Sequence, residues 1–192
     1  MSCEQLVKFY KSKDLSGDDI VELTGKSVVI YSDLKKYKNI ESLLGKENYT
    51  VLLYQTSAIN TGHYVALFIR FDGTLCFCDS YGYAPDSPQQ LGLTPFDEKL
   101  PRYLTTLIDK WTSSGKKFEY SKYDYQSKSP GIAVCGRYAS FMVKCGRHMT
   151  FREIERFLTQ NQSAFLTPDS IITLLTLFTL HEIRSFFDNV NR

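Results

Sequence analysis

Three apolar segments follow one another between residues 50 and 81, and they constrain the fold more than any other feature of the chain. They read TVLLYQ (50–55), HYVALFIRF (63–71) and TLCFCDSY (74–81). Each has the length and the β-branched and aromatic content of a β-strand. Asp72 and Gly73 separate the last two segments and form a pair typical of a tight hairpin turn. We therefore expect these segments to be the core strands of one sheet.

Helical patterns surround the predicted strands. Before them, Ser16 begins one helix, SVVIY (27–31) is a short strand, and Ser32 caps a helix that ends at Gly45. After them, we predict helices that begin near Leu104, at Cys135, at Thr150 with Glu153 as a capping box, and at Thr167, with another strand over KFEYSKYDY (117–125). The predicted fold class is α+β, with a central mixed sheet flanked by helices. A length of 192 residues with 43% hydrophobic content predicts a single domain over residues 1–192.

Composition excludes several classes of protein. The net charge of +2 is too small to predict nucleic-acid binding by bulk electrostatics. The N-terminus, MSCEQLVKFYKSKD, lacks the uninterrupted apolar segment of a secretion signal, and IITLLTLFTL (171–180) is about half as long as a membrane span, so we expect a buried helix there. Five cysteines, an odd number, favour free thiols in a reducing compartment. We expect an intracellular monomer with no cofactor and no membrane partner.

An ordered trio of residues carries the chemistry: His63 opens one predicted strand, Asp79 closes the next, and Cys135 opens a helix. These residue types supply the base, the orienting carboxylate and the nucleophile of acyl transfer. Unpaired N–H groups at a helix start favour a thiolate at Cys135. Gln126, nine positions earlier, offers an amide to an oxyanion, together with the backbone N–H groups of Cys135 and Gly136. The glycine would also let a substrate backbone approach the sulfur.

Each of these residues has a structural alternative when it is taken alone. Cys135 would be a buried core cysteine such as Cys145, His63 a structural histidine at a strand end, and Asp79 the cap of a turn. The joint occurrence of all four at element boundaries, in this order, favours catalysis over these alternatives. The other histidines, His148 and His181, lie in a polar turn and within the last predicted helix.

A different class of function is also open, a structural zinc site. Cys76 and Cys78 alternate on one predicted strand and would share one face, while Cys145 and His148 are separated by two residues. Together they would supply a CxC plus CxxH ligand set. CxC is an uncommon structural zinc pair, so this alternative ranks below the cysteine protease.

Residues 50 to 146 resemble a known group, adenain (the adenovirus maturation protease) and the SUMO- and ubiquitin-like-protein-specific proteases that share its fold. The resemblance rests on GHYVALFIRFDG, FCDSYGYAPD, the YQ pair at 125–126 and CGRYASF. It implies His63 as base, Asp79 as its partner, Cys135 as nucleophile and Gln126 as oxyanion-hole amide. Tyr64 stands where tryptophan is common. The interval from Gln126 to Cys135 is two or three residues longer than usual, so the SKSPGIA loop must bulge if Gln126 is to reach the oxyanion.

The resemblance also implies a substrate class. Such enzymes cut after glycine, often at Gly-Gly or Gly-X-Gly sites, because a narrow cleft excludes side chains. The short chain is similar to maturation proteases of adenoviruses, virophages and large DNA viruses, which predicts capsid and other virion proteins as substrates and a location in the host cytoplasm, the viral factory or the virion. Removal of ubiquitin or a ubiquitin-like modifier is the second alternative, and acetyl transfer to Ser, Thr or Lys is the third. Activation by a peptide or by DNA is left open.

Overall fold

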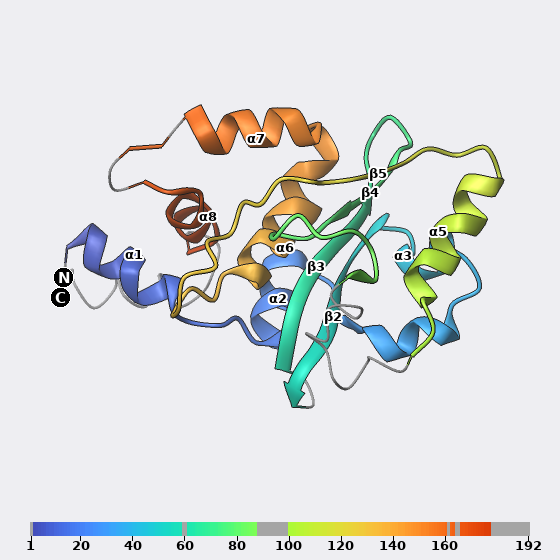
Figure 1. Cartoon of the computed structure of the whole chain (residues 1–192), viewed down its shortest axis with the longest axis horizontal. Helices are drawn as coiled ribbons and strands as arrows, with labels where there is room; N and C mark the ends of the chain where they lie inside the picture. Colours follow the sequence, from blue (N-terminus) through green and yellow to red (C-terminus); the bar gives the residue numbers. More distant parts are fainter. Residues whose placement is uncertain (1, 59–60, 88–99, 161, 164–165, 178–192) are drawn as a thin grey trace.

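The computed structural model describes residues 2–58, 61–87, 100–160, 162–163 and 166–177. A five-stranded mixed sheet lies at its centre, and helices cover both faces (Figure 1). The strands are β1 (Val29–Ile30), β2 (Tyr49–Ala58), β3 (Thr61–Ile69), β4 (Leu75–Cys78) and β5 (Phe118–Tyr120), in that spatial order. β2, β3 and β4 are antiparallel, whereas β1 and β5 pair in parallel at the edges. The predicted α+β class, with a mixed sheet flanked by helices, is confirmed.

The three central strands lie where the sequence predicts them. The predicted turn joins β3 to β4: Gly73 has a φ of +82°, and the N–H of Arg70 donates to the carbonyl of Thr74 at 2.9 Å. The two edge strands are shorter than predicted. β1 stops at Ile30 because a 3₁₀ turn begins at Tyr31. β5 stops at Tyr120 because the chain then leaves the ladder, and the N–H groups of residues 125 and 126 donate to the carbonyl of Ser80.

Two helical layers pack on the sheet (Figure 1). One layer contains α1 (Cys3–Lys11), α2 (Gly17–Thr24), α6 (Cys135–Cys145), α7 (Phe151–Gln160) and α8 (Pro168–Leu177); the other contains the 3₁₀ turn η1 (Tyr31–Lys36), α3 (Ile40–Leu44) and α5 (Tyr103–Ser113). Side chains of β4 alternate between the layers, because successive residues of a strand face opposite sides. Cys76 and Cys78 face the α6 layer, while Phe77 faces the α5 layer.

Side-chain caps explain most of the helix starts. Thr150 forms the predicted capping box of α7, and Ser16, predicted as a helix start, forms a capping box with Asp19 in α2. Ser2 with Gln5 forms a third, for a helix that the sequence analysis missed. The single helix predicted from Ser32 to Gly45 is wrong. The backbone is extended at Tyr37, and Asn39 caps a new helix, α3, by accepting from the N–H of Ser42 at 2.8 Å.

The apolar stretch predicted as a buried helix forms the second half of α8. Ile171, Ile172 and Leu177 are buried there, and residues 178–180 lie outside the described residues, as does His181. No helix in the described ranges has both the length and the apolar character that a bilayer span requires. α8 packs on α1 and α6, and its first turn holds the loop that precedes Cys135.

Candidate active site

His63 lies near the start of β3, opposite Tyr54 of β2. The pairing of these strands is regular up to Gln55 and then shifts, so an irregularity in β2 lies beside the histidine. Only 13% of the His63 side chain is exposed. Strand pairing on one side and burial on the other therefore hold the imidazole in one place.

Asp79 follows β4 directly and is fully buried. Its Oδ1 lies 3.0 Å from Nε2 of His63, a distance within ion-pair range, although the N–H direction does not reach the alignment of a full hydrogen bond. The same oxygen accepts the backbone N–H of Tyr81 at 2.8 Å. Because the protein interior shields such a pair poorly, the carboxylate acts strongly on the ring. Asp79 thus lies where an orienting carboxylate is needed.

Cys135 is the first residue of α6 and is partly buried, with a free thiol. The helix start has no side-chain cap among the described residues, so its first-turn N–H groups face the site unblocked by a cap. The side chains of Cys135 and His63 line the same pocket, and Cys135 contributes to the raised pKa of the imidazole. Since Nε2 faces Asp79, Nδ1 is the ring nitrogen available to the sulfur. The imidazole therefore lies between a carboxylate and a thiol.

The protonation of His63 follows from these neighbours. Burial alone would lower the pKa of the imidazole, but the close carboxylate of Asp79 and a further contribution from Cys135 together outweigh it. Together they raise the pKa of His63 from 6.5 to about 10. The raised pKa favours the protonated ring, an imidazolium.

Gln126 lies in the same pocket as His63 and Cys135, despite the long interval before the cysteine. Its side chain is almost fully buried: the hydroxyl of Ser80 donates to Oε1 at 2.8 Å, and Nε2 donates to the hydroxyl of Tyr81 at 3.0 Å. The extra residues form a loop in which Gly131 has a φ of +80°. It is the SKSPGIA segment, for which the sequence predicts a bulge if Gln126 is to reach the oxyanion.

A buried carboxylate on α8 holds the start of that loop. Asp169 accepts the backbone N–H of Ser127 at 3.2 Å and the hydroxyl of Tyr138 at 3.1 Å. Burial raises the pKa of Asp169. Tyr138 belongs to α6 and also donates to the carbonyl of Tyr125 at 3.1 Å. The carboxylate therefore joins three segments that meet beside Gln126.

The role predicted for Gly136 in substrate approach is wrong. A Cβ atom added there would lie 3.2 Å from side-chain atoms of Leu15 and Ile20 and 3.3 Å from the ring of Tyr64. Position 136 therefore faces α2 and β3, not the open pocket. The glycine lets the first turn of α6 lie close to these neighbours, which places Cys135 beside β3.

Sequence analysis assigned no role to Tyr81, which contacts three of the predicted site residues. Its ring stacks on His63, its N–H donates to Asp79 and its hydroxyl accepts from Gln126. The available signal was its position two residues after the acid, in the DSYG sequence. In the sequence alone, a tyrosine at that position is not distinguished from any other turn residue. Its role is visible only in the fold, which brings residues 63 and 126 beside it.

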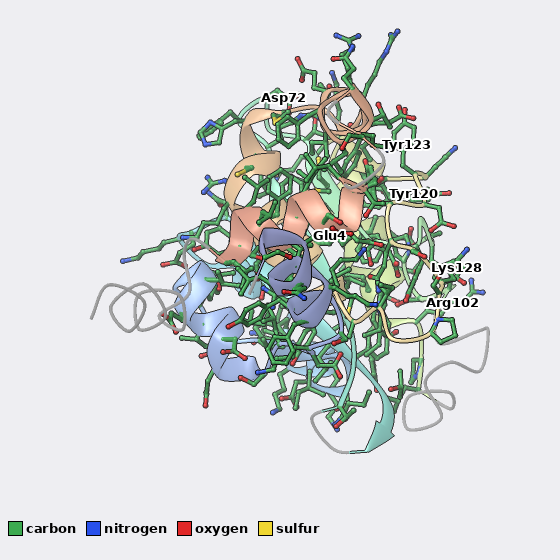
Figure 2. All side chains as sticks on the ribbon, turned by 90° about the vertical axis from the view of Figure 1, so that its left-hand side faces the viewer. Glu4, Asp72, Arg102, Tyr120, Tyr123 and Lys128 are labelled. Atoms are coloured by element: carbon green, nitrogen blue, oxygen red, sulfur yellow. The ribbon has the colours of Figure 1, made fainter. Side chains whose placement is uncertain are left out.

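Three of the four predicted residues, His63, Gln126 and Cys135, line an open pocket of about 300 Å³, and Asp79 is fully buried behind His63. The pocket is lined by Asp14, Thr56, Gly62, His63, Tyr81, Tyr83, Gln126, Ile132, Ala133 and Cys135. Lys128 extends over the rings of Tyr81 and Tyr83, with Nζ 5.9 Å from each ring centre. It projects on the side of the molecule that also carries Tyr120 and Tyr123 (Figure 2). The rings of Tyr81 and Tyr83 therefore form aromatic walls of the pocket beside the thiol.

The predicted zinc ligands do not come together. Cys76 and Cys78 are buried between the sheet and α6, while Cys145 is exposed at the far end of that helix. The ring of His148 packs against Phe71, with ring centres 4.5 Å apart. The described part of the chain holds no group of three or more His, Cys, Asp or Glu side chains arranged to bind a metal. The CxC plus CxxH alternative therefore has no support in the fold.

Two proteins similar to this chain are both uncharacterized, so neither names an activity. No family model matches the chain. It is 29% identical over 177 residues to the uncharacterized protein V9 of Sputnik virophage, a match that covers 89% of this chain and 98% of the virophage protein. Among solved structures, the central domain of the uncharacterized Lpg1148 protein from Legionella pneumophila is similar, at 14% identity and a TM-score of 0.39, over 92% of this chain and 99% of that one. The virophage protein has a closely similar extent.

Proposed function

We propose that the chain is a cysteine endopeptidase with the adenain-like fold. One observation carries the proposal: the His63 imidazole lies between the buried carboxylate of Asp79, at 3.0 Å, and the thiol of Cys135 at a helix start. His63 and Cys135 border an open pocket that Gln126 also lines, and Asp79 is buried behind the imidazole. Nucleophile, base and orienting acid within reach of one another are the recognised arrangement for acyl transfer.

The reaction follows from this arrangement. Nδ1 of His63 holds the proton of Cys135, and the thiolate sulfur attacks the scissile carbonyl carbon. The carbonyl oxygen becomes an oxyanion, which Nε2 of Gln126 and the backbone N–H of Cys135 stabilise. His63 then gives its proton to the leaving amine as the C–N bond breaks, which leaves a thioester. Water attacks the thioester with His63 as base, and the acid product and the free thiol are released.

The proposed substrates are virion proteins cut after glycine, at Gly-Gly or Gly-X-Gly sites. Two considerations support this choice: the resemblance of the motifs around His63, Asp79 and Cys135 to viral maturation proteases, and the virophage relative of similar extent. Tyr81 and Tyr83 line the pocket beside the thiol and would restrict the space for a bulky residue there. Release of a ubiquitin-like modifier and acyl transfer use the same three groups and differ only in substrate.

The test is a cleavage panel: virion-protein peptides with Gly-Gly or Gly-X-Gly sites, probes that end in the C-terminus of ubiquitin-like modifiers, and an acetyl donor with a Lys peptide. We expect peptide cleavage after glycine, and none with folded Cys135→Ala. A Gly-Gly vinyl sulfone should label Cys135 in preference to the exposed Cys145, and Cys145→Ser is the control that keeps activity. Turnover that persists without the Cys135 thiol, or a thiol inert to every probe, would refute the assignment.

A further inference from the structure

The four residues that follow β4 form a tight turn beside the pocket. The N–H of Gly82 donates to the carbonyl of Asp79 at 3.0 Å, and Gly82 has a φ of +73°. A Cβ atom at Gly82 would lie 2.9 Å from the carbonyl oxygen of Lys122. The turn therefore lies against the segment that leads to Gln126, and it has little freedom to move.

The ring of Tyr81 covers the imidazole from this turn. The ring centres of Tyr81 and His63 are 5.1 Å apart, and the planes are inclined by 22°. Burial foremost, and then the negative charges at Cys135 and Asp79, raise the pKa of Tyr81 to about 12. The phenol is thus neutral at working pH. Its aromatic face stabilises a positive charge on the imidazole, because the face of a π-system is negative.

The hydroxyl groups of Ser80 and Tyr81 bind opposite ends of one amide. Ser80 donates to Oε1 of Gln126, while Tyr81 accepts from Nε2, and the side chains of Ser80 and Gln126 are almost fully buried. A primary amide has two N–H groups, so the bond to Tyr81 leaves the second for the pocket. An amide turned by 180° would instead present Oε1, which would repel an oxyanion. Two partners that hold both ends keep the donor in place.

We propose that Tyr81 is a positioning residue for two groups at once: its ring holds His63, and its hydroxyl, with that of Ser80, holds the Gln126 amide toward Cys135. This rests on the proposed cysteine peptidase function. Tyr81 acts through His63 and Gln126 and takes no part in bond making. The turn after β4 then supplies the acid of the triad and, from the next two residues, the alignment of both the base and the oxyanion donor.

Removal of the hydroxyl alone tests the second of these roles. Tyr81→Phe keeps the ring on His63 and leaves the Gln126 amide free to turn. Loss of one oxyanion donor costs about 10² in rate, and a misaligned donor costs part of that, so we expect kcat to fall about tenfold with KM little changed. Ser80→Ala should act in the same direction. The double variant Tyr81→Phe with Gln126→Ala should have a kcat little below that of Gln126→Ala alone, because the Tyr81 hydroxyl acts through the Gln126 amide.

Removal of the ring tests the first role. Tyr81→Leu loses the aromatic face on the imidazolium, so the alkaline limb of kcat/KM should move to lower pH, while Tyr81→Phe should leave it in place. Tyr120→Phe, a tyrosine on β5 outside the pocket, is the matched control and should keep wild-type kinetics. The melting temperature of each variant separates misfolding from misalignment, and Tyr81→Phe remains decisive if Tyr81→Leu fails to fold.

The outcomes are distinct. The proposal is overturned if Tyr81→Phe matches Tyr120→Phe, or if the losses from Tyr81→Phe and Gln126→Ala multiply in the double variant. It is also overturned if Tyr81→Leu leaves the alkaline limb unchanged. An active wild type with any of these results leaves the peptidase proposal standing, whereas an inactive wild type with an inert Cys135 refutes the peptidase proposal itself.

Discussion

A Cβ atom at Gly62 would lie 1.8 Å from the carbonyl oxygen of Tyr54. The two backbones meet where the pairing of β2 and β3 becomes irregular, one residue before His63. No side-chain rotation relieves contact with a backbone atom, so the strand itself would have to move. The position of the histidine thus depends on the absence of a side chain on its neighbour.

Gly62→Ala should therefore damage both stability and activity. Overpacking in a well-packed site costs about 1–3 kcal/mol, and contact with a backbone atom belongs at or above the top of that range. Urea unfolding gives the free energy of unfolding. Gly17→Ala is the matched control, because a Cβ atom there meets nothing within 4 Å and alanine suits a helix. If the two variants unfold with equal free energies, β2 and β3 can move apart at Gly62 without a loss of stability, and the prediction is wrong.

Gly136→Ala should have a smaller effect with a specific rescue. The added methyl group meets side-chain atoms only, among them Cδ1 of Ile20 at 3.2 Å. We expect the free energy of unfolding to fall by about 1–2 kcal/mol. Activity should fall by a larger fraction, since Cys135 directly precedes the glycine. Ile20→Val removes that Cδ1 atom, so the double variant should regain part of the stability. A double variant with the sum of the two single losses would rule out this contact as the cause.

Much of the fold is predictable because its signals are local. The hairpin turn at Gly73, the helix start at Ser16 and the capping box at Thr150 depend on neighbouring residues, and each lies where the sequence predicts it. The helix predicted from Ser32 failed because Asn39 is a second cap inside the same apolar pattern. A periodic pattern does not reveal which of two caps begins the helix.

The site, like the fold, has features that local sequence predicts and features that it does not. Its candidate residues were found because each lies at an element boundary, which the sequence shows. The structural roles of Gly136 and Tyr81 were missed because each depends on a residue distant in sequence. Gly136 packs against Ile20, and Tyr81 binds the amide of Gln126. Packing of one helix against another, or of a ring against a distant amide, produces no periodic pattern in the sequence.

Asp169→Ala should disturb the pocket from a distance. The buried carboxylate accepts from the N–H of Ser127 and the hydroxyl of Tyr138, and buried donors left without an acceptor cost about 1–3 kcal/mol. The released loop would also let Gln126 shift, so kcat should fall. Tyr138→Phe is the control, since it leaves the bond to Ser127 intact. Equal losses of activity in the two variants would show that the loop needs no anchor on α8.

The charge on His63 makes a prediction about pH. Its pKa in the folded protein is raised from 6.5 to about 10, so the folded state binds the proton more tightly than the unfolded state does. The resulting stabilisation is complete below pH 6.5 and is lost as the pH rises through about 10. The difference in free energy of unfolding between wild type and His63→Gln should therefore shrink over this window. The alkaline limb of kcat/KM should lie near pH 10, because the leaving amine needs the imidazolium proton.

Asp79→Asn separates the carboxylate from the other influences on the ring. The largest effect on the pKa of His63 is burial, which lowers it, and Asp79 supplies most of the opposing charge. Without that charge the pKa of His63 should fall, and the alkaline limb should move to lower pH with residual activity. NMR titration of the imidazole in Cys135→Ala and in Cys135→Ala with Asp79→Asn measures the shift directly. A His63 that titrates near 6.5 in both proteins would mean that the carboxylate at 3.0 Å does not hold the proton on the ring.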